Sequence, residues 1–243
     1  YFNSAGVLTS AAADQPRFDY NPSTLAAQGL LIEEARTNSI RNNTMVGAVA
    51  GTPGTLPTNW YVFTVLTGLT QSIVGTGTEN GITYIDLRLS GTPSASGSVS
   101  IGFDASNFIA AANGQTWTNS NYYKISAGSL TGISVVRTTV AEYSAANAFL
   151  AGTFTIQSTP TSNWQRGAST RTFSQATTAF ASPGFQIDLT GAAIDITLRI
   201  GLPQLELGAF ATSVIPTTTT ALTRSADVAS VNTLSPWYNQ SAG

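Results

Sequence analysis

Short runs in which apolar and polar residues alternate recur along this chain from Trp60 onward. The clearest are 82–89 and 194–202, where aliphatic side chains occupy every second position. A period of two residues is typical of a β-strand with one buried face, because successive side chains of a strand point to opposite sides. After Ser39 no segment of ten or more residues shows the apolar stripe of a helix. The sequence therefore predicts an all-β protein.

Turn residues separate these runs, and their number indicates the architecture. Segment 91–97 is rich in Gly, Pro and Ser and separates 82–89 from 98–103, so we expect these two strands to form a hairpin. The glycines of 75–81 indicate a hairpin turn. Many short strands predict a two-sheet antiparallel β-sandwich, or jelly roll. The other expected strands are 115–123, 132–141, 149–157, 168–175, 183–190 and 194–202.

Composition divides the chain into three parts. Residues 1–45 hold a dense share of the charges and are predicted to form an extended N-terminal arm, because Gly29 interrupts the one helix-like stretch. Residues 46–216 are assigned to the sandwich, which begins with a loop over 47–58. Residues 217–243 are expected to be a connector to a further domain. The chain opens with Tyr1, which suggests a fragment or a processed chain.

The scarcity of reactive residues excludes several functions. Charged residues make up 9% of the chain, the net charge is -2, and there is no His and no Cys. These absences exclude a Ser-His-Asp triad, the usual zinc and haem ligand sets, and any disulfide. A single Lys and scattered Arg residues argue against a nucleic-acid partner. No apolar run approaches about 18 residues, so membrane insertion is not expected.

Segments at both ends of the chain resemble phage and prophage tail-associated proteins. The similarity lies in 1–8, 16–20 and 29–38 (YFNSAGVL, PRFDY, GLLIEEARTN) and in 203–217 with 224–229 (PQLELGAFATSVIPT, RSADVA). Between them, 114–118 (GQTWT) looks like a strand start of jelly-roll carbohydrate-binding modules of families four and nine. The resemblance implies a tail-fibre, receptor-binding or virion-surface module with a glycan-binding-like sandwich, located on the virion or outside the cell and compatible with a homotrimeric fibre.

Recognition of a glycan without a metal needs flat aromatic faces for stacking and planar polar groups for the hydroxyls. Adjacent strand residues point to opposite faces, so one tyrosine of the pair 122–123 is expected to face outward. Two outward strand faces carry an Asp-x-Arg pattern. The candidate ligand-binding residues are therefore Trp164, Trp60, Tyr122, Tyr123, Tyr84, Asp86, Arg88, Asp195 and Arg199. Two alternatives stay open: core packing for the aromatic residues, Trp117 included, and cross-strand ion pairs for the charged ones.

The thin inventory of acids and bases favours binding over catalysis. We therefore predict a non-catalytic module that binds a bacterial polysaccharide, with no cofactor. One alternative is a structural spacer or oligomerisation module of a virion fibre. A second is a polysaccharide-degrading enzyme, which would need two carboxylates on either side of the scissile bond. Asp188 and Asp195 flank the turn 190–193 and are the pair expected to meet there, either for catalysis or for a structural calcium ion.

Overall fold

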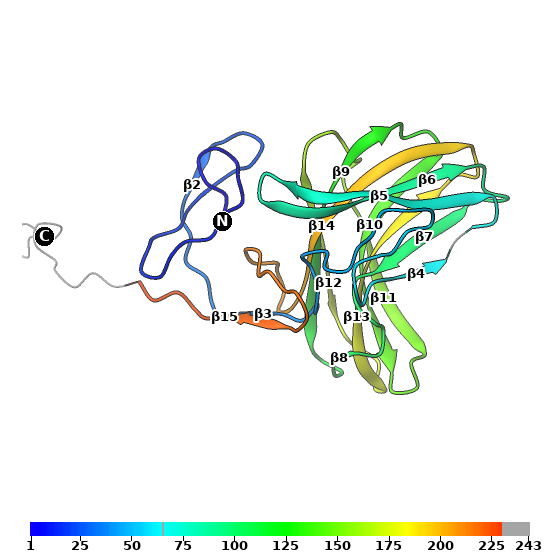
Figure 1. Cartoon of the computed structure of the whole chain (residues 1–243). Coiled ribbons are helices and arrows are strands. Elements are labelled where there is room, and N and C mark those ends of the chain that lie inside the picture. The colour runs from blue at the N-terminus through cyan, green and yellow to red at the C-terminus, as the bar shows by residue number, and fades with distance from the viewer. Residues whose placement is uncertain (65, 230–243) are drawn as a thin grey trace, which may run out of the picture.

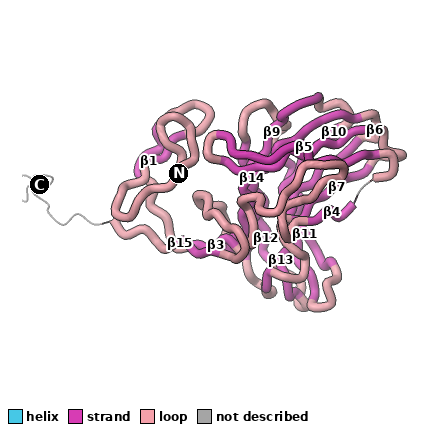
Figure 2. The backbone as a smooth tube through the Cα atoms, viewed as in Figure 1, coloured by secondary structure: helices cyan, strands magenta, loops and turns pink. Residues whose placement is uncertain are grey.

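The computed structural model describes residues 1–64 and 66–229, and its centre is a sandwich of two antiparallel sheets (Figure 1). One sheet has six strands: β11 (Phe149–Ile156), β10 (Ile133–Ser144), β13 (Thr178–Leu189), β7 (Gly97–Gly102) and β4 (Tyr61–Thr64) in that order, with β8 (Ile109–Ala110) beside β13. The other has five: β12 (Gln165–Thr172), β9 (Thr116–Gly128), β14 (Ile194–Leu207), β6 (Ile82–Gly91) and β5 (Leu69–Glu79). None of the described residues is helical, as Figure 2 shows. The predicted all-β sandwich is confirmed.

The core lies between the two sheets and is filled by the alternating aliphatic residues. Ile85, Leu87 and Leu89 of β6 are buried there, as are the isoleucines of β14. Phe185 and Ile187 of β13 face them from the six-stranded sheet. Each such side chain contributes about 1.5–3 kcal/mol by leaving water. The inward faces expected from the alternation are confirmed.

The pairing of β6 is different from the expectation. The strand pairs with β5 and β14, whereas β7 lies in the other sheet, so 82–89 and 98–103 do not form a hairpin. Asn80 and Gly81 have φ angles of 50° and 78° and join β5 to β6. Two successive positive φ values are what a two-residue type I′ turn requires, and Asn-Gly is its preferred sequence. This turn fixes β5 as the partner, and the chain after Gly91 crosses between the sheets.

An irregularity in β14 moves Leu202 away from its expected place. The register between β14 and β9 shifts between Gly201 and Gln204, and Leu202 has a φ of 42°. A bulge of this kind adds one residue to the strand, so beyond it the positions that point inward and outward are exchanged. Leu202 therefore packs on the outer side of the sheet with Ile82, and the prediction that it continues the inward row is wrong.

The arm and the exit segment meet beside the sandwich. Strands β1 (Phe18–Tyr20) and β2 (Ala27–Leu30) form a separate two-stranded sheet, and β3 (Arg36–Asn38) pairs with β15 (Leu222–Arg224). The chain thus enters and leaves the sandwich through one ribbon (Figure 1). The arm is extended as expected, since it contains the strands β1, β2 and β3, and 47–58 is a loop with turns and isolated bridges. The part of the expected connector over 230–243 lies outside the described residues.

A group of ionic contacts ties the arm to the exit segment. Arg17 binds Glu33 at 2.8 Å and also pairs with Asp227, and Arg224 lies 3.1 Å from Glu33. The backbone N–H of Ser213 donates to Glu33 at 2.7 Å. We call these five residues the clasp. No helix that is long and apolar enough to cross a membrane occurs in 1–64 or 66–229.

Candidate functional site

Two of the aromatic candidates lie in the core. Trp60 packs against Phe103, with ring centres 4.8 Å apart, and its indole N–H donates to the Asn42 carbonyl at 2.8 Å. Tyr123 points inward against Phe185, and its hydroxyl donates to a loop carbonyl. Both rings are buried, and so is Trp117. The core-packing alternative is therefore the one that the structure shows for Trp60 and Tyr123, and neither ring is open to a ligand.

Tyr122 points away from the core, as strand alternation requires, yet it is 4% exposed. Phe2 of the arm covers it, with ring centres 6.1 Å apart, and the Arg166 guanidinium lies 5.4 Å from the ring centre. The arm folds over this part of the five-stranded sheet, which the strand pattern alone does not reveal. Trp164 packs edge-on against Tyr122 and is the candidate tryptophan that keeps a partly open surface.

The charged candidates lie together on the outer face of the five-stranded sheet. Asp86 and Arg199 are direct cross-strand partners and share two hydrogen bonds of 2.8 Å. Arg88 and Asp195 form a diagonal pair with the same distances. The hydrogen bonds that Arg199 donates to Asp86 raise the pKa of Arg199, and the hydrogen bonds that Arg88 donates to Asp195 lower the pKa of Asp195. These groups satisfy one another, so the cross-strand ion pairs expected as the alternative are present.

A site that the sequence analysis missed lies on the outer face of the six-stranded sheet. We call it the groove, and its volume is about 180 Å³. Its aromatic residues come from the two opposite edges of the sheet, β4 and β11, and from the end of β10, whereas its floor comes from β7, β13 and β10. The lining residues are Phe63, Tyr143, Phe149 and Phe154, with Ser100, Ile101, Thr139, Ala141, Ser182, Pro183 and Gln186 between them.

Glycines in the sheet let two rings lie flat on the backbone. A Cβ atom added at Gly102 would be 2.3 Å from the Tyr61 ring, and one added at Gly152 would be 2.8 Å from the Phe154 ring. Rings supported from below in this way present their other face to solvent. Phe154 is 40% exposed, and Phe63, which packs against the Tyr61 ring at 4.5 Å between ring centres, is 45% exposed. Phe149 is 53% exposed. The result is two aromatic walls on either side of a floor of small and polar residues.

Polar groups on the floor are held in fixed positions. The Gln186 amide accepts a hydrogen bond from Ser100 at 3.3 Å and donates one to Asp188 at 2.6 Å. Asp188 is in turn paired with Arg137 at 2.7 Å. Burial raises the pKa of Tyr143, so its hydroxyl stays neutral. None of the residues that line the groove is charged, so it suits a neutral ligand that carries both apolar faces and hydroxyl groups.

The carboxylate pair expected for catalysis or calcium does not assemble. Asp188 belongs to β13 of the six-stranded sheet and Asp195 to β14 of the five-stranded sheet, so the turn between them crosses the sandwich instead of closing a hairpin. Each carboxylate is bound by a different arginine. In the described part of the chain no group of three or more acidic residues could hold a metal ion.

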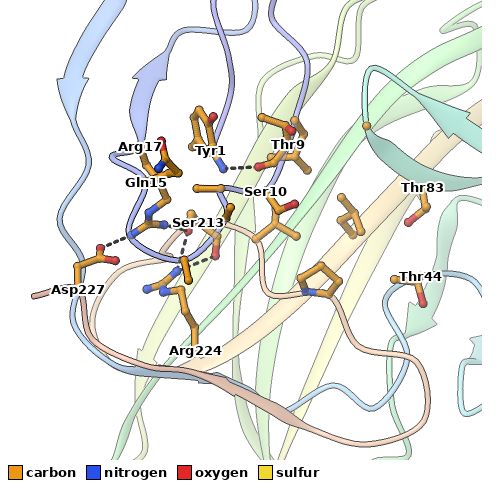
Figure 3. A pocket seen from close by; sticks show the side chains of 18 of the residues that line it. Tyr1, Thr9, Ser10, Gln15, Arg17, Thr44, Thr83, Ser213, Arg224 and Asp227 are labelled. Carbon is orange, nitrogen blue, oxygen red and sulfur yellow. Dashed lines mark hydrogen bonds and ion pairs between the residues drawn. The ribbon is translucent and has the colours of Figure 1, made fainter.

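A larger cavity of about 610 Å³ lies between the arm and the sandwich (Figure 3). Thr9, Ser10, Thr44 and Thr83 are among its lining residues, and the clasp closes one side. The guanidinium groups of the clasp point toward Ser213 and Asp227 and are occupied there. Tyr1 is its single aromatic lining residue. The cavity offers hydrogen bonds but no pair of opposed rings.

No family model and no curated protein sequence matches this chain. Similar solved structures include an arabinose-bound α-L-arabinofuranosidase, at 17% identity and a TM-score of 0.49 over 70% of this chain and 26% of that one. The enzymatically active domain of bacteriophage CBA120 tailspike protein 4 has 10% identity and a TM-score of 0.42, over 62% and 20%. The CBM22-1 xylan-binding domain of Paenibacillus barcinonensis Xyn10C has 13% identity and a TM-score of 0.37, over 72% and 94%. The chain thus spans about a quarter of the first of these proteins, and the likeness concerns the fold alone.

Proposed function

We propose that this chain is a non-catalytic carbohydrate-binding module that holds a neutral polysaccharide in the groove. The observation that carries the proposal is the pair of aromatic walls on either side of a polar floor: Phe63, which packs against Tyr61 behind it, and Phe149 with Phe154. The C–H faces of a pyranose ring stack on such surfaces, and the Gln186 and Ser182 side chains can bond its hydroxyl groups.

The proposed setting is a phage or prophage tail, where the ligand is a polysaccharide of the bacterial surface. The resemblance of both chain ends to tail-associated proteins supports this setting. A shallow groove with a few stacking contacts gives modest affinity for one site. Several copies in a homotrimeric fibre would raise the apparent affinity, because each later contact becomes intramolecular.

A second candidate function, assembly of a fibre, is favoured by one observation on the arm. Phe18 and Leu30 are direct partners across the β1–β2 sheet, and both are about half exposed, as is Ile32. A two-stranded sheet is rarely stable by itself, and an apolar face on it suits a contact with another copy. Sedimentation of the chain as a monomer at high concentration would count against this function.

The test of the proposed function is a bacterial polysaccharide screen followed by calorimetry on variants. Phe154→Ala removes one ring of a wall, and Phe18→Ala removes another solvent-exposed phenylalanine, from the arm. We expect Phe154→Ala to weaken binding by about tenfold or more, since stacking of this kind is worth ~1 kcal/mol beyond the buried area. Phe18→Ala should bind like the unchanged protein. A polysaccharide that binds both variants equally well would show that the groove is not the site.

A further inference from the structure

A further pocket lies between the arm and the turn of the β5–β6 hairpin. Figure 1 shows the arm beside the tip of this hairpin. The pocket has a volume of about 190 Å³ and is mostly polar. Ser23 belongs to the arm, Asn80 to the hairpin turn, Lys124 to β9, and Asn163 to the loop before β12. We call it the arm pocket. It is on the opposite sheet from the groove and shares no lining residue with it.

Trp164 forms one wall of the arm pocket. Its ring is held by Tyr122 and Tyr84, at 6.4 and 6.3 Å between ring centres. The indole N–H is buried and has no acceptor among the described residues. An unpaired buried donor is costly and rare, so it calls for an explanation. A ligand oxygen that met this edge after a small tilt of the ring would satisfy it.

Unused hydrogen-bonding groups converge on the same pocket. Within the described part of the chain, the side chains of Ser23, Asn80 and Asn163 donate and accept no hydrogen bond, although their backbones do. Together two amides and a hydroxyl offer both donors and acceptors. The charged groups on the neighbouring outer face of the five-stranded sheet, by contrast, are paired with one another, Arg88 with Asp195 and Arg199 with Asp86.

The charges at the pocket balance. Lys124 donates to both Glu79 oxygens at 3.0 and 3.1 Å, and Arg199 donates to the same carboxylate at 2.9 Å. Burial raises the pKa of Glu79, but the hydrogen bonds from Lys124 and Arg199 outweigh it and lower the pKa overall. Glu79 is therefore an ionised, fixed acceptor. Arg199 is itself neutralised by Asp86, so no net positive charge is left to attract an acidic ligand.

We propose that the arm pocket is a second ligand site, which binds one neutral pyranose unit against Trp164. The volume corresponds to about six water molecules at ~30 Å³ each, which is room for one sugar ring and not for a chain. Glu79 accepts hydrogen bonds from hydroxyl groups of the sugar, and the amides of Asn80 and Asn163 bind the remaining hydroxyls. The inference takes its ligand class from the proposed function but uses different residues. Because the ligand would contact both Ser23 and Trp164, binding would also fix the arm against the sandwich.

The experiment titrates the full chain with methyl glycosides of glucose, galactose, mannose, rhamnose and N-acetylglucosamine while the tryptophan indole N–H signals are followed by NMR. The Trp164 signal is assigned with Trp164→Phe. We expect at least one glycoside to shift the Trp164 signal saturably and to slow tryptic cleavage at Arg17. Asn163 is exposed, so we expect Asn163→Ala to keep the fold and to weaken this binding about tenfold or more.

Phe154→Ala should leave the Trp164 shift unchanged, although it weakens polysaccharide binding in the groove. Loss of both responses in Phe154→Ala would overturn the second site, because the glycoside would then be bound in the groove. A Trp164 signal that no glycoside moves would overturn it too, while the polysaccharide screen still decides the proposed function. Methyl glucuronide that binds more tightly than every neutral glycoside would overturn the assignment of a neutral ligand.

Discussion

The Arg199 guanidinium lies 3.6 Å from the centre of the Tyr84 ring, on the outer face of the five-stranded sheet. The same guanidinium binds Asp86 and Glu79, so it is held over the ring by two carboxylates. One face of Tyr84 is therefore occupied by a cation. This contact explains why a tyrosine in an outward strand pattern does not offer a free stacking plane on that side.

The two arginine pairs on this sheet face should differ in their effect on stability. Both have hydrogen bonds of 2.8 Å, but the Arg199 side chain is 16% exposed and the Arg88 side chain 45%. Arg199→Ala removes an arginine partner from both Asp86 and Glu79. We expect the free energy of unfolding in urea to fall by about 1–3 kcal/mol. Arg88→Ala should cause no measurable change, because water screens an exposed pair. Equal losses in the two variants would contradict this.

Glu142 should make the sandwich sensitive to acid. Burial raises the pKa of this carboxyl, but hydrogen bonds from Thr178, Arg171 and two backbone N–H groups outweigh it and lower the pKa overall. A lowered pKa in the folded state gives stability that is present above the unfolded pKa of 4.5 and is lost as the pH falls through the folded value.

The measurement is the free energy of unfolding in urea between about pH 7 and pH 3. We expect it to fall below about pH 4.5 and to fall less steeply in Glu142→Gln, which starts from a lower stability at neutral pH. Glu34→Gln serves as the control, since Glu34 is exposed. If the free energy of unfolding fell with pH as steeply in Glu142→Gln as in the unchanged protein, other carboxylates would account for the loss of stability in acid.

Gly102 should be needed for the shape of the groove. A Cβ atom at this position would strike the Tyr61 ring, so Gly102→Ala must push the ring aside. We expect weaker polysaccharide binding, and a loss of stability of about 1–3 kcal/mol from overpacking. At Gly75 an added Cβ would lie 3.6 Å from its nearest neighbour, so Gly75→Ala is the matched control and should change neither property. Calorimetry and urea unfolding measure the two effects.

Glu33 should hold the arm in place without stabilising the sandwich. Glu33 accepts hydrogen bonds from Arg17 and from both the backbone and hydroxyl of Ser213, and it pairs with Arg224. Glu33→Gln leaves Arg17 with Asp227 as its remaining carboxylate partner, and it leaves Arg224 with the Ser213 hydroxyl and the Glu34 carbonyl. We expect faster tryptic cleavage at Arg17 and an unchanged urea midpoint for the sandwich.

The neighbouring variant Glu34→Gln removes the same charge from an exposed side chain and should cleave at the original rate. A Glu33→Gln variant that is cleaved faster and also has a lower urea midpoint would show that the arm and the sandwich unfold as one unit. The separate role of the clasp would then be wrong.

The sequence predicted the sandwich well because alternation is a local property. Ile85 and Ile196 had to point inward whatever the strands were paired with. The pairing of strands, by contrast, depends on residues far apart in the chain. The expected hairpin of β6 with β7 is therefore wrong, and the Asn80–Gly81 turn pairs β6 with β5. The alternation of aliphatic residues likewise does not indicate the bulge beyond Gly201.

The candidate site was harder to predict, since exposure depends on what covers a strand. Tyr122 faces outward but lies beneath Phe2, which is 120 positions earlier in the chain. Phe63 and Phe154 are on opposite edges of one sheet, and nothing in their local sequence distinguishes them from core residues. The available signal is the pair of glycines that lie beside aromatic rings in space, Gly102 beside Tyr61 and Gly152 beside Phe154, and it can be recognised only once the strand register is known.

The paired strands β3 and β15 determine how the protein would respond to a pulling force. Arg36 and Arg224 are opposite each other at the outer end of this ribbon, so a force that separates the arm from the exit segment acts on that end first. Strands pulled apart from one end separate one hydrogen bond at a time, which is a mechanically weak geometry. The clasp lies at this end of the ribbon, so its ion pairs would have to break before the strands separate. A force between the arm and the exit segment would thus pass beside the sandwich and leave the groove undistorted until the clasp breaks.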